Sequence, residues 1–149
     1  NARTPMQWTD DENAGFTDGT PWLAMNPNYR QINVREQEVR TDSVLAYYRR
    51  LVHLRKADAY RETFTYGIFE PAYQEMADVF AYYRVSGESG QRILVAANFG
   101  TDAVSLPLAY PCRQVLLSNL RAESAVETAC EKANALTLES CEVAVIELG

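Results

Sequence analysis

Apolar and polar positions alternate with a period of two over much of the second half of the chain, the pattern of half-buried β-strands. Each run combines β-branched or aromatic residues, and turns rich in Gly or Pro separate the runs. The predicted strands are residues 63–70, 78–85, 92–99, 103–108, 113–118, 135–139 and 142–148. Seven short strands at this spacing predict a mainly β fold, an antiparallel sandwich.

Residues 42–56 follow a helical pattern instead. Their apolar side chains recur at spacings of three and four, while Arg and Lys occupy the other side and the last turn. The apolar stripe consists of Val44, Leu45, Tyr47, Tyr48, Leu51, Val52 and Leu54. Thr41 or Asp42 is the expected N-cap of this amphipathic helix. Residues 120–134 are rich in Ala and Glu and fit either a surface loop or a short helix.

Residues 1–34 show neither period and are dense in Asn, Asp, Thr, Gly and Pro, so they predict a long loop. Long loops in compact domains are usually functional or disordered, and the aromatic residues here argue against disorder. The flat faces of Trp8, Phe16, Trp22 and Tyr29, together with planar amides, suit the mixed surface of a sugar.

The same segment carries a family resemblance. The stretches NARTPMQW, NAGFT, PWLAMNPNY and INV stand here in the order found in α-glucosidases of glycoside hydrolase family 13. The chain resembles the branch with oligo-1,6-glucosidase, dextran glucosidase and trehalose-6-phosphate hydrolase. The resemblance continues through DSVLAYYRRLVHLRK, which is similar to the last helix of the family's (β/α)8 barrel. It then extends, more weakly, through DVFAYYR, ILVAANF and EVAVIEL.

This resemblance implies two parts. Residues 1–58 would be the end of a catalytic barrel, consisting of the loop after strand eight and the last helix, and residues 59–149 a C-terminal Greek-key β-sandwich. A whole barrel needs roughly 250 residues, so 149 residues are expected to be a fragment of a longer enzyme. The expected partners are the enzyme's own barrel and an oligosaccharide substrate.

The resemblance also decides which site residues are expected. Retaining glycosidases use two carboxylates roughly 5 to 5.5 Å apart. In the family these acids, with a third Asp, follow barrel strands that precede Asn1, so no catalytic residue is expected here and the fragment should be inactive. The resemblance implies that Arg3, Gln7 and Trp8 help to build the substrate-binding wall. Arg3 would orient a carboxylate or a sugar hydroxyl, or else bond loop carbonyls, and Trp8 would stack on a sugar or serve as a packing anchor.

Composition argues against two classes of function. A formal charge of −6 without a basic cluster argues against nucleic acid as a partner, and no apolar run is long enough to span a membrane. Three widely spaced cysteines, without a CxxC pair, fit reduced thiols in the cytoplasm. No cofactor and no metal site is expected.

Two functions from different classes fit these observations. The first is the C-terminal part of an intracellular retaining α-glucosidase that acts on α-1,6 or related linkages of small oligosaccharides. The alternative is a non-catalytic β-sandwich module that binds carbohydrate. The amphipathic helix favours the first function, because a free-standing sandwich does not need the helix's apolar stripe. If the stripe is uncovered in the fragment, the fragment is expected to associate with itself.

Overall fold

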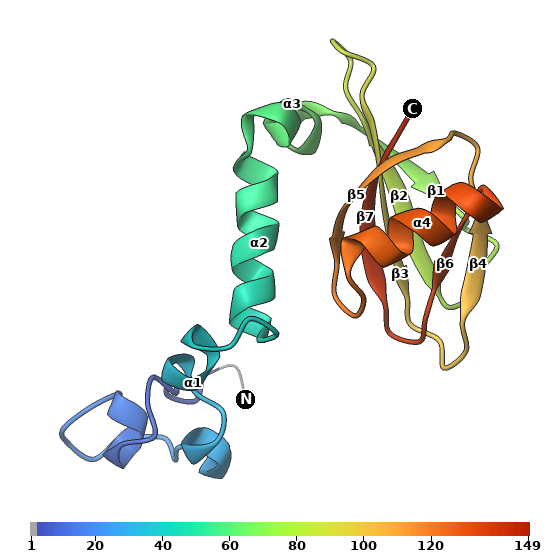
Figure 1. Cartoon of the computed structure of the whole chain (residues 1–149). Coiled ribbons are helices and arrows are strands. Elements are labelled where there is room, and N and C mark those ends of the chain that lie inside the picture. The colour runs from blue at the N-terminus through green and yellow to red at the C-terminus, as the bar shows by residue number, and fades with distance from the viewer. Residues whose placement is uncertain (1–2) are drawn as a thin grey trace. The chain divides into compact units, whose positions relative to one another are not determined.

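The computed structural model describes residues 3–149, apart from the side chains of Glu131 and Ala133. The chain divides into two compact units, Asn1–Arg50 and Leu51–Gly149 (Figure 1). Helix α2, Val44–Lys56, runs through the division between them.

The first unit consists of loops that carry short helices, in agreement with the absence of any sequence period. These are the 3-10 helices η1 (Glu12–Gly15) and η2 (Pro27–Arg30) and the short α1 (Val34–Glu38). Asparagine side chains begin two of them, since Asn26 accepts a hydrogen bond from the Asn28 amide at 3.3 Å and Asn33 accepts one from the Glu36 amide at 2.9 Å.

The predicted amphipathic helix forms as α2, but its predicted cap is wrong. The Ser43 hydroxyl accepts a hydrogen bond from the Ala46 amide at 3.0 Å, which makes Ser43 the capping side chain. The Asp42 side chain instead pairs with Arg40, whose guanidinium donates to both carboxylate oxygens at 3.0 and 2.9 Å. None of the 13 residues of α2 is buried.

Helix α3 (Asp58–Tyr66) replaces the beginning of the first predicted strand, so the prediction of residues 63–66 as a strand is wrong. The amide of Arg61 donates to the Ala57 carbonyl at 2.8 Å, and the rings of Tyr60 and Phe64 meet one turn apart with centroids at 6.4 Å. Gly67 is the C-cap of the helix, and the position requires glycine because a Cβ there would lie 2.4 Å from the carbonyl oxygen of Thr63.

Seven strands follow, as the alternation predicts, and they make two antiparallel sheets. Five strands form the larger sheet in the order β1-β2-β3-β7-β5, and β4 pairs with β6 in the smaller one. The strands are β1 (Ile68–Ala72), β2 (Val79–Val85), β3 (Arg92–Asn98), β4 (Val104–Pro107), β5 (Cys112–Ser118), β6 (Ala135–Leu138) and β7 (Val143–Leu148). The expected antiparallel Greek-key β-sandwich is confirmed.

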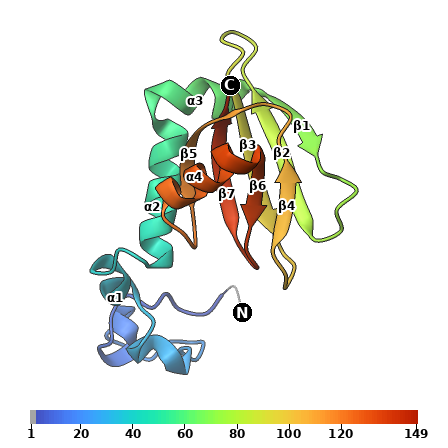
Figure 2. The same ribbon diagram turned by 45° about the vertical axis from the view of Figure 1, so that its right-hand side comes forward.

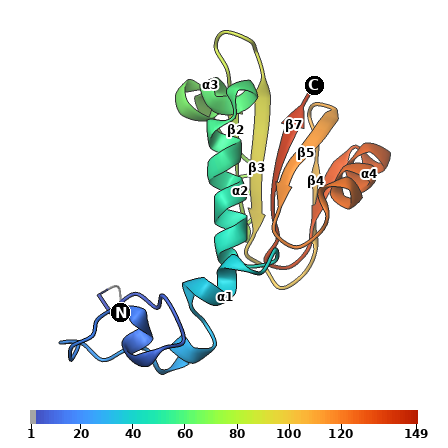
Figure 3. The same cartoon turned by 60° about the vertical axis from the view of Figure 1, so that its left-hand side comes forward.

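The core lies between the two sheets and under helix α4 (Glu123–Ala133) (Figure 2). Residues 120–134, for which the sequence fits either a surface loop or a short helix, thus contain a helix. Val126 and Cys130, four residues apart on α4, are each 1% exposed and pack with Leu94, Leu136 and Ile146. Figure 3 shows α3 and α4 on opposite sides of the five-stranded sheet. One face of that sheet is therefore in the core, and the other faces away from it.

Between residues 3 and 149, no helix combines the length and the apolar character needed to cross a bilayer.

Candidate functional site

A tight turn organises the opening loop. Three consecutive residues, Asn13, Ala14 and Gly15, have positive φ values of 52°, 54° and 64°. This conformation is costly for Ala, whose side chain is nevertheless completely buried. The side-chain amide of Asn13 holds the turn, because its Nδ2 atom donates to the carbonyls of Thr17 and Gly19 at 3.2 and 3.1 Å. Such strain persists only where the surrounding structure fixes it, and it often marks functional loops.

Backbone hydrogen bonds hold Gln7 and Trp8 in the opening loop. The Trp8 amide donates to the Ala14 carbonyl at 2.9 Å, which attaches it to the strained turn. On the other side, the amides of Val34 and Arg35 donate to the carbonyls of Gln7 and Trp8, both at 3.0 Å. Trp8 is therefore hydrogen-bonded to both η1 and α1, and Gln7 is hydrogen-bonded to the beginning of α1.

The Gln7 side chain contributes to a hollow of about 230 Å³. Its Nε2 atom donates to the Asn28 Oδ1 atom at 3.1 Å and to the Ile32 carbonyl. Those bonds occupy the donor side of the amide and leave Oε1 as the atom that can accept from a ligand hydroxyl. The hollow is lined by Thr4, Pro5, Met6, Gln7, Ile32, Asn33, Val34 and Gln37.

The other two predicted site residues lie outside the lining of this hollow. The Arg3 guanidinium stacks over the Trp22 ring, 5.5 Å from its centroid. Trp8 is 47% exposed, so it is not a buried packing anchor within this chain. The structure thus puts Gln7 in the hollow and Arg3 on Trp22, and it leaves part of the Trp8 ring open to a ligand or a neighbouring domain.

Polar residues that the sequence did not single out as site residues hold this arrangement. Arg35 donates to Asp10 and Asp11, both at 2.7 Å, and hydrogen bonds from Thr9 and Arg35 lower the pKa of the Asp11 carboxyl. Asn33 is 2% exposed and donates to the Tyr29 carbonyl at 2.8 Å while it caps α1. An Asn before a helical segment was the available signal for Asn33, whereas nothing local connects Arg35 to residues 10 and 11.

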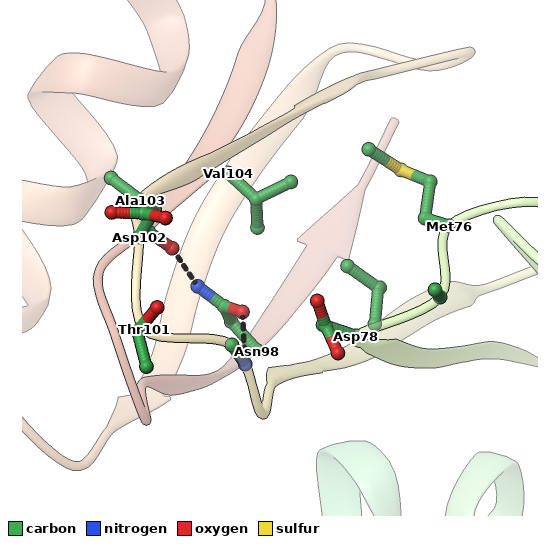
Figure 4. Close-up of a pocket in the computed structure, with 10 residues that line it drawn as sticks. Met76, Asp78, Asn98, Thr101, Asp102, Ala103 and Val104 are labelled. Atoms are coloured by element: carbon green, nitrogen blue, oxygen red, sulfur yellow. Dashed lines mark hydrogen bonds between the residues drawn. The ribbon is translucent and has the colours of Figure 1, made fainter.

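A second hollow, of about 320 Å³, lies in the sandwich at the turn between β3 and β4 (Figure 4). Its buried polar group is Asn98, which donates to the Asp102 carbonyl at 2.8 Å and accepts from the Gly100 amide at 2.9 Å. These bonds satisfy Asn98 and shape the turn, so the hollow has a structural origin. Throughout the described residues, no group of three or more His, Cys, Asp or Glu side chains is placed to hold a metal ion.

Comparison with known proteins gives this geometry its context. Residues 1–67 match the family described as "Alpha amylase, catalytic domain". The chain is 39% identical over 131 residues to the oligo-1,6-glucosidase of Parageobacillus thermoglucosidasius, which covers 85% of this chain and 22% of that protein. It is also 39% identical over 127 residues to the glucan 1,6-alpha-glucosidase of Streptococcus pneumoniae, covering 85% of this chain and 23% of the relative.

Solved structures agree with these sequence matches. The isomaltulose synthase PalI of Klebsiella sp. LX3 aligns over 100% of this chain and 25% of its own, with a TM-score of 0.83 and 32% sequence identity. The chain therefore spans about a quarter of the length of the relatives it matches. Its residues 1–67 match part of a catalytic domain, and its antiparallel sheets agree with a C-terminal β-sandwich region. The chain belongs to the alpha-amylase family, glycoside hydrolase family 13.

Proposed function

We propose that this chain is the C-terminal part of a cytoplasmic retaining α-glucosidase that hydrolyses α-1,6 or related glucosidic bonds of small oligosaccharides. In this proposal residues 1–58 complete the catalytic barrel and residues 59–149 form the sandwich behind it. The names of two relatives, an oligo-1,6-glucosidase and a glucan 1,6-alpha-glucosidase, support the linkage. The three cysteines are widely spaced in the sequence and form no CxxC pair, which supports a reducing compartment.

The observation that carries the proposal is the exposed stripe of α2. Val44 is 75% exposed, Tyr48 62%, Val52 38% and Leu51 36%. Burying an apolar side chain of this size contributes roughly 1.5 to 3 kcal/mol, so an exposed row of them is unusual in a self-contained domain. A barrel whose last helix is α2 would cover the stripe. A free-standing carbohydrate-binding sandwich offers no such cover.

The chain's own contribution to catalysis would be positioning. The two catalytic carboxylates would come from the rest of the barrel, and this chain would supply none of them. Gln7 Oε1 would accept from a sugar hydroxyl, and the exposed part of the Trp8 ring would lie against an apolar sugar face. Arg3, held on Trp22, would direct its guanidinium to a carboxylate or a hydroxyl.

A chimera tests this function. The matching C-terminal segment of the Parageobacillus oligo-1,6-glucosidase is replaced by this chain, and release of glucose from isomaltose is measured. We expect the chimera to hydrolyse isomaltose and the chain alone to give the rate of buffer. Turnover by the chain alone, or a folded chimera without activity, would contradict the proposal.

A further inference from the structure

Arg35 connects the beginning of α1 to the stretch of the opening loop that carries Trp8. Its backbone amide donates to the Trp8 carbonyl at 3.0 Å. Its guanidinium donates through Nη1 to the Asp10 Oδ1 atom and through Nη2 to the Asp11 Oδ2 atom, both at 2.7 Å. These carboxylates stand 25 and 24 residues earlier in the chain. One residue of α1 is therefore bonded to Trp8, Asp10 and Asp11.

This arrangement depends on the fork of the guanidinium. Arginine presents its N–H donors in one plane, so two of its nitrogens can each serve a different carboxylate. A lysine ammonium is a point charge on a flexible stem and would not hold two carboxylates in fixed directions. Arg35 also offsets the repulsion between the like charges of Asp10 and Asp11, which are adjacent in the sequence.

Both ends of the connection belong to hydrogen-bonded structures. Asn33 is 2% exposed, caps α1 and donates to the Tyr29 carbonyl at 2.8 Å. On the other side, the Ala14 carbonyl accepts from the Trp8 amide at 2.9 Å, and the Ala14 amide donates to the Asp11 carbonyl at 3.0 Å. Residues 8–14 thus close on themselves, and Arg35 ties them to α1.

The exposure of these ion pairs separates positioning from stability. The side chains of Arg35, Asp10 and Asp11 are 53%, 52% and 63% exposed. Exposed ion pairs contribute little to the free energy of folding, so loss of the guanidinium should leave the backbone bonds of the loop in place. The Trp8 ring is 47% exposed and is not held by burial within this chain. Its place therefore depends on how residues 8–11 lie relative to α1.

We propose that Arg35 is a positioning residue for the Trp8 ring in the substrate site. The proposal rests on the proposed function, in which the exposed part of this ring lies against an apolar sugar face. By joining Asp10 and Asp11 to α1, Arg35 sets the place of the ring before substrate binds. Such a contact acts on the bound substrate and on the transition state alike, so Arg35 lowers KM without raising kcat.

Kinetics of the chimera test this role. Arg35→Met keeps the backbone bond to Trp8 and removes both ion pairs. We expect KM for isomaltose to rise about fivefold and kcat to stay within about twofold, because a displaced ring loses part of its contact with the sugar. A purely structural role would lower the folded fraction, and hence the apparent kcat, while KM stayed unchanged.

Arg40→Met is the matched control for this substitution. Arg40 also forms a forked pair, at 3.0 and 2.9 Å, but its partner Asp42 is only two residues away, so the pair joins no distant segments. Both kinetic constants should be unchanged in that variant.

Two further changes show whether the ion pairs themselves carry the effect. Arg35→Lys keeps the charge without the fork and should raise KM nearly as much as Arg35→Met. Asp10→Ala combined with Asp11→Ala removes the same pairs from the other side and should also raise KM. Adding Arg35→Met to that double variant should then have no further effect, as expected of residues that act through one interaction.

The isolated chain offers a measurement that requires no activity. Trp8 and Trp22 are its two tryptophans, so in a Trp22→Phe background the fluorescence comes from Trp8 alone. Quenching by acrylamide then reports how accessible the Trp8 ring is. We expect Arg35→Met to change the quenching constant and Arg40→Met to leave it as it was.

The outcomes separate this proposal from the proposed function. In an active chimera, an unchanged KM for Arg35→Met, or a fall in kcat alone, would overturn the positioning role and leave the function standing. Unchanged quenching in the isolated chain would overturn it in the same way. An unsubstituted chimera that folds but is inactive would overturn both proposals.

Discussion

Arg121 and Glu142 form a largely buried ion pair, with the Nη2 atom of Arg121 2.7 Å from the Oε2 atom of Glu142. The Glu142 side chain is fully buried, whereas Arg121 is 28% exposed. Ser118 donates to Oε1 at 3.0 Å and the Glu139 amide donates to Oε2 at 2.8 Å, so both carboxylate oxygens are occupied. The pair joins the chain entering α4 to the beginning of β7.

Removing Arg121 should destabilise the sandwich strongly. Arg121→Met leaves an unpaired carboxylate in the interior, and we expect a loss of about 3 kcal/mol, the low end for such pairs because Arg121 is partly exposed. Hydrogen exchange of the Val145 amide measures this loss. The surface pair Arg40–Asp42 is the control, since its side chains are 60% and 73% exposed. Arg40→Met should lower the free energy of unfolding by less than about 1 kcal/mol. Equal effects at both positions would contradict the assignment.

The same carboxyl group predicts a dependence on pH. Burial opposes the ionisation of Glu142, but hydrogen bonds from Arg121, the Glu139 amide and Ser118 outweigh it and hold its pKa below the ordinary value of 4.5. A lowered folded pKa means that its contribution to the unfolding free energy is complete above pH 4.5 and declines as the pH falls through the folded value. Glu142→Gln should weaken the sandwich near neutral pH and flatten this acid slope. An unchanged slope in that variant would assign the acid sensitivity to other groups.

The strained turn makes Gly15 sensitive to substitution. In Gly15→Ala, a Cβ would lie 2.6 Å from the Thr9 hydroxyl at a φ of 64°, so we expect the opening loop to lose about 1 to 2 kcal/mol. Gly19→Ala is the matched control, because the nearest atom to its Cβ would be 3.8 Å away. Exchange of the Trp8 amide, which donates to Ala14, reports the change. Similar exchange rates in both variants would mean that the turn does not hold Trp8.

The positioning roles proposed for the opening loop are tested in the chimera. Trp8→Ala keeps both backbone bonds of that residue, so its effect on kcat/KM for isomaltose reports the ring itself. We expect a loss on the order of tenfold, comparable with an aromatic contact worth about 1.5 kcal/mol. Tyr66→Ala serves as the comparison, since Tyr66 is 80% exposed at the end of α3. A Trp8→Ala chimera with full activity would remove Trp8 from the substrate site.

The exposed α2 stripe should make the isolated chain associate with itself. Tyr48 and Leu51 lie one turn apart on the helix surface and are 62% and 36% exposed. Sedimentation equilibrium should show a fraction of dimer that increases with protein concentration. The Leu51→Glu variant should form less dimer, while hydrogen exchange of the β7 amides stays slow. A strict monomer at high concentration would indicate that the stripe needs no partner.

The strands could be predicted because one face of each is in the core and the other is not. Leu94, Ala96 and Ile146 alternate with outer residues, so the sequence period of two records their burial. The same reasoning failed at residues 63–66, where aromatic and β-branched residues have strand propensity but Ala57 and Gly67 delimit a helix. The cap at Ser43 was missed because three adjacent residues, Thr41, Asp42 and Ser43, have capping side chains and the pairing of Asp42 with Arg40 is decided in three dimensions.

The candidate site was only partly predictable. The composition of residues 1–34 indicated an ordered functional loop, and the order of its short motifs indicated the family. The left-handed Ala14 could not be read from sequence, because Ala has no preference for positive φ. The ties from Gln7 to Asn28 and from Arg35 to Asp10 and Asp11 join residues more than 20 positions apart. Contacts at that separation depend on the folded path of the loop rather than on any local pattern.

The most direct measurement of the central claim is the hydrogen exchange of the α2 amides, Val44–Lys56, in the isolated chain and in the chimera. If a catalytic barrel covers α2, burial of at least two large side chains at roughly 1.5 kcal/mol or more each should slow exchange on the order of a hundredfold in the chimera. Exchange in β7 serves as the internal reference and should remain similar in both proteins. Equal exchange of α2 in an intact, folded chimera would contradict the claim that this chain completes the catalytic domain of an α-glucosidase.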